Sequence, residues 1–441
     1  MTQFLQSFVE DIVYSVRGLR RDPFLAFAAT ITLAVSIGAN TAVFSIADSI
    51  LIRPLPYPNS GRIDWISERA GPAREDIAVA PDYYQIRDQN RIFEDVAEFG
   101  PLTLNWTGVE RPEQLDAASA SVSFFRVMGA PPLLGRYFAR DEEGPKAPPV
   151  VVLSYAFWHN RLGSDAHVLG KAIALDRLPR TIIGVAPQGF DFPHGAQLWI
   201  PSALDESSQR TISATRLIFV VSIVARRKPD VTPQHAAAEM SRFTLLIRAQ
   251  YASEFRKTSF RSDLTISAAP LQQHLTGQVR PALLMLTGAV SLVLLIACVN
   301  LANLLLARAI RRRRELAVRL AIGSSRSRIV RQMLTESLVL ALPGGVVGMG
   351  LGWAAARLLD AVKPGILARY PPIAVDLRVL AFTAVLTLAT SLLFGMAPAW
   401  SAGGIHLLEA LKSAGLAHSP ARGARLRRVL VVAELAIPSC C

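Results

Sequence analysis

The residue patterns that carry enzymatic chemistry are absent from this sequence. It contains no G-x-x-x-x-G-K-[ST] loop to cradle nucleotide phosphates, and the turn at residues 323–325 is followed by Arg326. Neither H-E-x-x-H nor G-x-S-x-G occurs, and the seven histidines are scattered. The acidic run Asp141–Glu143 lies in a proline-rich stretch, where adjacent carboxylates are usually solvated. We therefore expect no catalytic centre, no cofactor and no metal site in this chain.

The strongest pattern is an arginine-rich segment, Arg308–Glu336, which contains nine arginines and two glutamates. Helical character runs from Ala307 to Ile322, after which Gly323 can end the helix and the following serines can cap a second one. One interpretation is an anchor on anionic lipid. The other is a rigid element that docks a soluble partner and converts its motion into helix movement. The pattern alone supports both.

The formal net charge of +13 lies in short segments. Residues 48–280 hold 26 basic and 25 acidic side chains, whereas residues 401–428 hold five basic and one acidic. Short basic segments beside apolar runs are typical of cytoplasmic loops, and a nucleic-acid surface would spread basic and aromatic residues across a soluble domain. We therefore expect no nucleic-acid partner. None of the three cysteines falls within residues 48–280, so no disulfide framework is expected there.

Four uncharged apolar runs are each long enough to cross a membrane, because about 20 helical residues span the hydrocarbon core. They account for the mean hydropathy of +0.32. The runs are Phe24–Ala47, Pro281–Ala307, Ser337–Ala356 and Val379–Ala402. The first is too long for a signal-peptide core, which favours an uncleaved anchor. The sequence therefore predicts a four-helix membrane protein.

The basic segments orient these spans. When they are placed in the cytoplasm, the N-terminus is cytoplasmic and residues 48–280 lie outside. The predicted order is a cytoplasmic amphipathic helix (1–23), span one (24–47), an extracytoplasmic domain (48–280), span two (281–307), a cytoplasmic loop (308–336), span three (337–356), an external loop (357–378), span four (379–402) and a cytoplasmic basic segment (403–441). Within the last, Val429–Ile437 resembles the opening of a further apolar segment, so we expect the chain to be a truncated piece of a longer protein.

The predicted external domain has an α+β pattern. Residues 150–153, 181–185 and 217–224 are β-rich runs, and Pro233–Gln250 reads as a helix that Thr232 can cap. Two strand-rich parts are expected, without a defined boundary between them. The predicted fold class is thus a membrane α-helical protein with a large α+β extracytoplasmic domain between the first two helices.

The third span contains a ridge of small residues at four-residue spacing, formed by Gly344, Gly348 and Gly352. Such a ridge permits close helix approach. Contact with a second permease copy and packing against the chain's own spans both fit this pattern.

Several blocks in order along the chain resemble the FtsX-like permeases that carry a MacB-like periplasmic core, and in particular the N-terminal half of the duplicated orphan permeases (ADOP). The blocks are TLAVSIGANTAVFSIADSILIRPLPYP (32–58), SVSFFRVMGAPPLLGRYF (121–138), LSYAFWHNRLG (153–163), IIGVAPQGFDFP (182–193) and ACVNLANLLLARAIRRRRELAVRLAIGSSRSRIVRQMLTES (297–337). The second external domain and further four spans of a duplicated member do not occur in this sequence.

The resemblance implies an ABC-type permease of the bacterial inner membrane that has no enzymatic activity of its own and works with a cytoplasmic ATPase. In this family, ATP-driven closure of the ATPase dimer pushes the coupling helix after span two, and the movement reaches the external domain. Carried onto this chain, the coupling role falls on Arg314, Glu315, Arg319, Gly323, Arg328, Gln332 and Glu336.

Alternative functions stay open from the sequence. The chain fits an export permease for small molecules, peptides or lipids. It also fits an FtsX-like regulator that moves nothing across the membrane and binds a periplasmic partner, such as a cell-wall hydrolase. A receptor without an ATPase and an inactive fragment of a longer permease are further alternatives.

Overall fold

The computed structural model describes residues 11–17, 20, 22–69, 78–203, 220–250, 264–311, 318, 326–362 and 375–403. They form two compact units. The first unit lies within residues 1–53 and 278–441, and the second unit lies within residues 54–277. Part of the predicted amphipathic helix and almost all of the basic segment 403–441, with its further apolar run at Val429–Ile437, lie outside the described residues.

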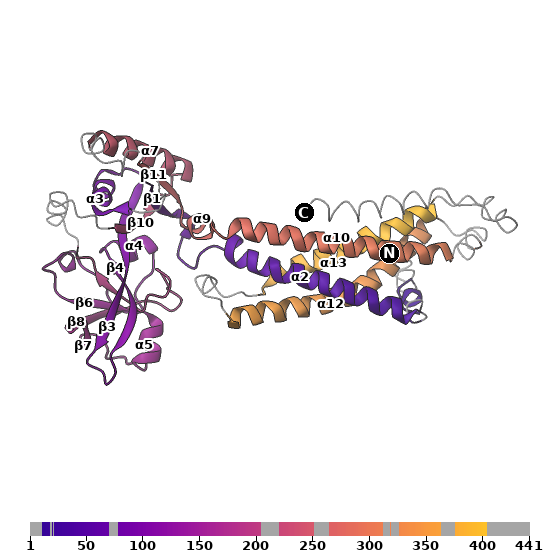
Figure 1. Ribbon diagram of the computed structural model, residues 1–441, viewed down its shortest axis with the longest axis horizontal. Helices are drawn as coiled ribbons and strands as arrows, with labels where there is room; N and C mark the ends of the chain where they lie inside the picture. Colours follow the sequence, from indigo (N-terminus) through magenta and orange to yellow (C-terminus); the bar gives the residue numbers. More distant parts are fainter. Residues whose placement is uncertain are drawn as a thin grey trace. The chain divides into compact units, whose positions relative to one another are not determined.

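The first unit is a bundle of four long helices that run side by side (Figure 1). They are α2 (Pro23–Ala47), which the π-helical turn η1 (Asp48–Ile52) extends, α10 (Arg280–Arg311), α12 (Arg326–Val362) and α13 (Leu377–Gly403). Each contains a stretch long and apolar enough to cross a membrane. Residues 11–17 are also helical.

The helices extend beyond the predicted spans because the spans were bounded by the first charged residue, whereas a helix continues through charged residues once it leaves the hydrocarbon. The clearest case is α12, which has 37 residues and therefore a length of about 55 Å, against a hydrocarbon core of about 30 Å. A single helix thus contains both the predicted span three and the second half of the predicted cytoplasmic loop.

The second unit is built on one continuous sheet with the strand order β11-β1-β10-β3-β4-β9-β6-β8-β5. Its first lobe consists of β1, α3, β3, β10, α7 and β11, in which all neighbouring strands are antiparallel. This is the split βαβ arrangement of ferredoxin-like folds. The bounds are β1 (Ile63–Arg69), β2 (Ala78–Val79), α3 (Ala80–Gln89), β3 (Phe93–Thr107), β10 (Val220–Arg227), α7 (Pro233–Gln250), β11 (Thr265–Pro270) and α9 (Leu271–Thr276).

A second lobe is inserted between β3 and β10, and we call it the inserted lobe. Its elements are β4 (Glu113–Ala120), α4 (Phe124–Met128), β5 (Leu134–Gly135), the 3-10 turn η3 (Arg140–Glu142), β6 (Val150–Leu153), α5 (Tyr155–Arg161), β7 (Ala172–Leu175), β8 (Leu178–Val185) and β9 (Leu198–Pro201). Another 3-10 turn, η2 (Ser60–Arg62), precedes β1 outside this lobe. The two lobes share β3, which pairs with β10 along its first part and with β4 and β7 beyond it. The predicted α+β character, strand 150–153 and helix 233–250 are confirmed.

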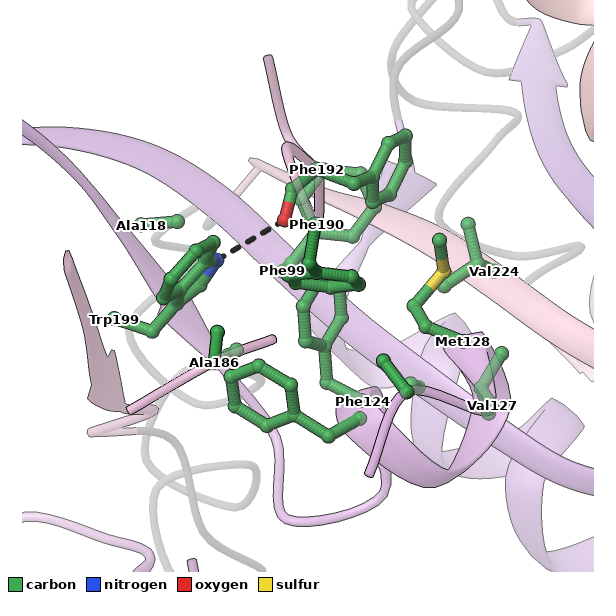
Figure 2. Packing of buried hydrophobic residues seen from close by; sticks show 14 of the residues in the cluster. Phe99, Ala118, Phe124, Val127, Met128, Ala186, Phe190, Phe192, Trp199 and Val224 are labelled. Atoms are coloured by element: carbon green, nitrogen blue, oxygen red, sulfur yellow. Dashed lines mark hydrogen bonds between the residues drawn. The ribbon is translucent and has the colours of Figure 1, made fainter. Parts of the chain in front are cut away.

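Three buried clusters hold the second unit together. One lies between the sheet and helices α3 and α7, and a second lies around α5 in the inserted lobe. Between them is a central cluster that is rich in aromatic side chains, which Figure 2 shows around Phe99, Phe124, Phe190, Phe192 and Trp199. The central cluster contains residues of both lobes and thereby joins them.

A carboxyl group is buried where the lobes meet. Glu98 on β3 is 1% exposed, and its Oε1 atom has no hydrogen-bond partner among the residues that the structure describes. Burial raises the pKa of Glu98 from 4.5 to about 7; a hydrogen bond from Ser202 lowers it and the nearby Glu143 carboxylate raises it further. The sheet therefore accommodates Glu98 best in its protonated form.

Glu98→Gln should make the stability of the second unit, residues 54–277, less dependent on pH. Because the folded-state pKa of Glu98 lies above the unfolded value, its stabilising contribution is complete below about pH 4.5 and is lost as the pH rises to about 7. At pH 8 the variant should unfold with a free energy higher than wild type by on the order of 3 kcal/mol, and near pH 4 the two should match. Urea unfolding of the full chain in detergent, followed by tryptophan fluorescence, measures this. The exposed Glu110→Gln is the control, and identical pH profiles for wild type and Glu98→Gln would contradict the assignment.

Candidate functional site

The bundle is organised around the contact between α12 and α2. A Cβ atom added at Gly344 would lie 2.7 Å from Cβ of Leu33, and one at Gly348 would lie 2.9 Å from the backbone oxygen of Ala34. A Cβ atom at Gly352 would meet Thr41 at 2.8 Å. The three glycines of the predicted ridge therefore lie directly on α2, where they allow the two backbones to approach closely.

Hydroxyl side chains continue this small-residue contact onto α13 and α10. Thr387 of α13 lies against Gly345, and its hydroxyl donates to its own helix at the Thr383 carbonyl. Thr41 and Thr383 pair across helices at 3.1 Å, and the amide of Asn40 donates to the Val290 carbonyl of α10 at 3.0 Å. Most hydroxyl groups here are satisfied within their own helix, so close packing contributes more to the interface than interhelical hydrogen bonds do.

A cluster of charges closes the end of the bundle at which α10 ends and α12 begins; we call it the loop-end cluster. Arg308 of α10 is 8% exposed, and its guanidinium lies 3.0 Å from Oδ2 of Asp22 and 3.1 Å from Oε1 of Glu336. Arg331 of α12 donates from Nε to Oδ2 of the buried Asp11 at 2.9 Å. The cluster thus joins α10, α12, the start of α2 and the helical residues 11–17.

The loop-end cluster flanks the predicted coupling segment. Arg314, Glu315, Arg319 and Gly323 lie outside the described residues. The other three predicted coupling residues lie at four-residue spacing on α12: Arg328, Gln332 and Glu336. Arg328 is exposed, whereas Glu336 forms the ion pair with Arg308. The structure therefore brings Glu336 into a contact between helices.

A second charged cluster lies at the opposite end of the bundle. Asp48, at the start of the π-helical turn, is 1% exposed and lies 3.6 Å from Nη2 of Arg53 and 3.8 Å from Nη1 of Arg378. Arg53 also donates to Asp376 at 2.9 Å. These residues join the end of α2 to the start of α13.

Sequence reasoning missed both clusters. Charged residues beside apolar runs indicated where the chain leaves the membrane, but their partners lie far away in the sequence, as for Asp11 and Arg331. Asp22, Arg308 and Glu336 each occur at the edge of an uncharged run, which was the available signal. Among the described residues no group of histidine, cysteine or carboxylate side chains is arranged to hold a metal ion.

Two family models match the chain. A MacB-like periplasmic core domain matches residues 26–243, and an FtsX-like permease C-terminal domain matches residues 287–407. The macrolide export ATP-binding/permease protein MacB of Hahella chejuensis is 26% identical over 385 residues, which are 86% of this chain and 54% of that protein. The probable syringafactin export ATP-binding/permease protein SyfD of Pseudomonas syringae pv. tomato is 26% identical over 70% of this chain and 43% of its own length.

Solved structures are similar to part of the chain. The periplasmic region of MacB from Actinobacillus actinomycetemcomitans aligns with 50% of this chain and 94% of its own, with 15% identity and a TM-score of 0.36. The chain spans about half the length of the curated relatives that it matches.

The α12–α2 contact can be tested with two glycines of one helix. Gly348→Ala should destabilise the bundle, because the new Cβ atom would lie 2.9 Å from a backbone oxygen and force the helices apart. Gly350→Ala is the matched control: a Cβ atom there meets nothing within 4 Å, so higher helix propensity should make this variant neutral or slightly more stable. Thermal unfolding in detergent measures the difference, and equal melting temperatures would contradict the contact.

The partly buried ion pair of Arg308 and Glu336 should show strong coupling in a double-mutant cycle. Arg308→Met leaves the Glu336 carboxylate without this counter-charge and should cost roughly 3 kcal/mol, while Arg308→Met with Glu336→Met should recover most of that loss. Chemical unfolding of the bundle measures all four forms. Additive effects of the two substitutions would show that the side chains do not interact.

Proposed function

Since this chain belongs to the FtsX-like permeases with a MacB-like periplasmic core domain, we propose that it is the permease subunit of an ABC-type complex. In this proposal a separate cytoplasmic ATPase supplies the energy, and the permease converts its motion into movement of the external domain. The 441 residues contain no phosphate-binding loop of the Walker type, so in this proposal ATP is hydrolysed outside them.

The observation that carries the proposal is the continuity of the two helices that flank residues 312–325. α10 runs unbroken to Arg311, and α12 runs unbroken from Arg326 through the apolar bundle to Val362. The Arg308–Glu336 pair holds them together beside that segment. A push on the segment would therefore reach the ends of both helices, and each continuous helix can carry a displacement along its length.

The arginine-rich segment is proposed to lie in the cytoplasm of a bacterial cell, with the N-terminus on the same side of the inner membrane and residues 54–277 on the other. Its excess of basic residues supports this orientation. Arg314, Glu315, Arg319, Gly323, Arg328 and Gln332 are proposed to contact the ATPase. Glu336 acts instead by holding α12 on α10, given its ion pair with Arg308.

The names of the relatives support export as the process. They include proteins for macrolide, syringafactin and pyoverdine export. We extend this to the present chain as export of a small molecule, peptide or lipid. The proposal covers this chain as one part of a complex, because the match spans about half of each relative.

Charge reversal in the coupling segment tests the proposal. The full chain, co-reconstituted with a cognate ATPase, should stimulate ATP hydrolysis, and Glu315→Arg with Arg319→Glu should reduce ATPase binding and stimulation by about tenfold or more, since each charge contact at a docking surface is reversed. The exposed Arg177→Glu in the external unit is the control and should change neither quantity. Unchanged stimulation in the Glu315/Arg319 variant would contradict docking at this segment.

A further inference from the structure

The chain passes from α2 into the external unit through a short proline-rich segment. Pro54, Pro56 and Pro58 alternate there with Leu55 and Tyr57. Each proline fixes its own φ and restricts the residue before it, so the segment has few conformations available. It follows directly on Ile52 and Arg53 along the chain, so these residues are the first that a displacement of the end of α2 would reach.

Tyr57 contacts a loop of the inserted lobe. Its ring lies edge-on to Phe190 and Phe192, with centroid distances of 5.8 and 6.3 Å. Both phenylalanines are at most 6% exposed and belong to the central cluster (Figure 2). Burial and the nearby Asp191 carboxylate raise the pKa of the Tyr57 hydroxyl, so this hydroxyl stays protonated at physiological pH.

The loop that carries the two phenylalanines is held firmly. The indole nitrogen of Trp199 on β9 donates to the Phe192 carbonyl at 3.1 Å, which Figure 2 shows as a dashed line. The backbone N–H of Gly195 donates to Asp191 at 2.8 Å. A force on this loop would therefore act on β9 and on the lobe that β9 belongs to.

The residues that follow Tyr57, and those that precede α10, contact the first lobe. Arg226 of β10 donates to the Pro58 carbonyl at 3.2 Å, and Arg227 of β10 donates to the Gly61 carbonyl. At the return crossing, His274 of α9 stacks on Trp65 of β1 with ring centroids 4.1 Å apart. Nε of Arg226 also donates to the Val127 carbonyl of the inserted lobe at 2.8 Å. Pro58 thus contacts the first lobe, whereas the Tyr57 ring contacts the Phe190–Phe192 loop of the inserted lobe.

We propose that Tyr57 is the positioning residue through which a displacement at the end of α2 moves the inserted lobe relative to the first lobe. The inference rests on the proposed function, because it assigns a path to the movement that the ATPase produces. Tyr57 acts through the Phe190–Phe192 loop, and its ring, not its hydroxyl, transmits the displacement.

One experiment needs no ATPase. In the full chain in nanodiscs, Tyr57→Ala should speed hydrogen exchange of residues 188–197 by about tenfold, since the loop loses an aromatic contact, while residues 172–185 stay unchanged. Tyr57→Phe should exchange as wild type does. Unchanged exchange of residues 188–197 in Tyr57→Ala would overturn the inference, whatever the ATPase does.

The second experiment follows the movement itself. In a chain with its cysteines replaced, spin labels at the exposed Arg177 and Ala238 report on the two lobes. With the cognate ATPase bound, ATP should change their distance in wild type and Tyr57→Phe, and Tyr57→Ala should lose the change while its ATP hydrolysis continues. Phe157→Ala is the control: it removes a buried ring that contacts Trp106 and not the segment at residues 54–58, so it should keep the ATP-dependent change in distance.

A full ATP-dependent change in distance in Tyr57→Ala would overturn the inference. Failure of the ATPase to bind wild type would contradict the proposed function and leave the exchange result to decide the role of Tyr57.

Discussion

The close approach of α12 to α2 is the constraint on which the bundle depends. Between apolar helices in lipid there is no hydrophobic driving force, so association relies on van der Waals contact over a well-matched surface. Glycines at four-residue spacing on α12 supply that surface. Gly38 on α2 faces them, and a Cβ atom at Gly38 would lie 3.0 Å from the Gly348 oxygen. A larger residue on either helix would separate the backbones and also the charged groups at the ends of the bundle.

The two charged clusters follow from that packing. Arg308 reaches Asp22 and Glu336 only when α10, α12 and the start of α2 are close together, and the same holds for Asp48 with Arg53 and Arg378 at the other end. Between the ends, the helices meet through small residues whose hydroxyl groups are mostly bonded within their own helix. The ion pairs therefore hold the ends of the helices together. In the middle of the interface, few hydrogen bonds between helices would have to break if one helix shifted along its neighbour.

Much of the fold could be predicted from the sequence, because local patterns determine it. The four apolar runs predict four long helices, the helix 233–250 has a cap and an apolar face, and the strand 150–153 is three valines followed by a leucine. The shared strand β3 could not be predicted, since its 15 residues pair with three different partners and no local signal distinguishes its two parts. The glycine ridge was visible as a pattern, but its partner α2 was not. The ion pair of Arg308 and Glu336 was hidden for the same reason, as charges at the edge of a span are equally expected when they face lipid headgroups or water.

Three of the sequence blocks that resemble the family contribute aromatic side chains to one region of the second unit. Tyr57 belongs to the block that ends at residue 58, Phe124, Phe125 and Phe138 to the block 121–138, and Phe190 and Phe192 to the block 182–193. The structure gathers these rings around one central cluster that contains residues of both lobes. Sequence blocks far apart in the chain therefore describe a single packed region, and that region also receives the chain as it leaves α2. An aromatic cluster of this kind resists compression because its rings are already in van der Waals contact. A displacement that enters through the proline-rich segment is thus carried to the loop at Phe190 and Phe192 more readily than it is absorbed where it enters.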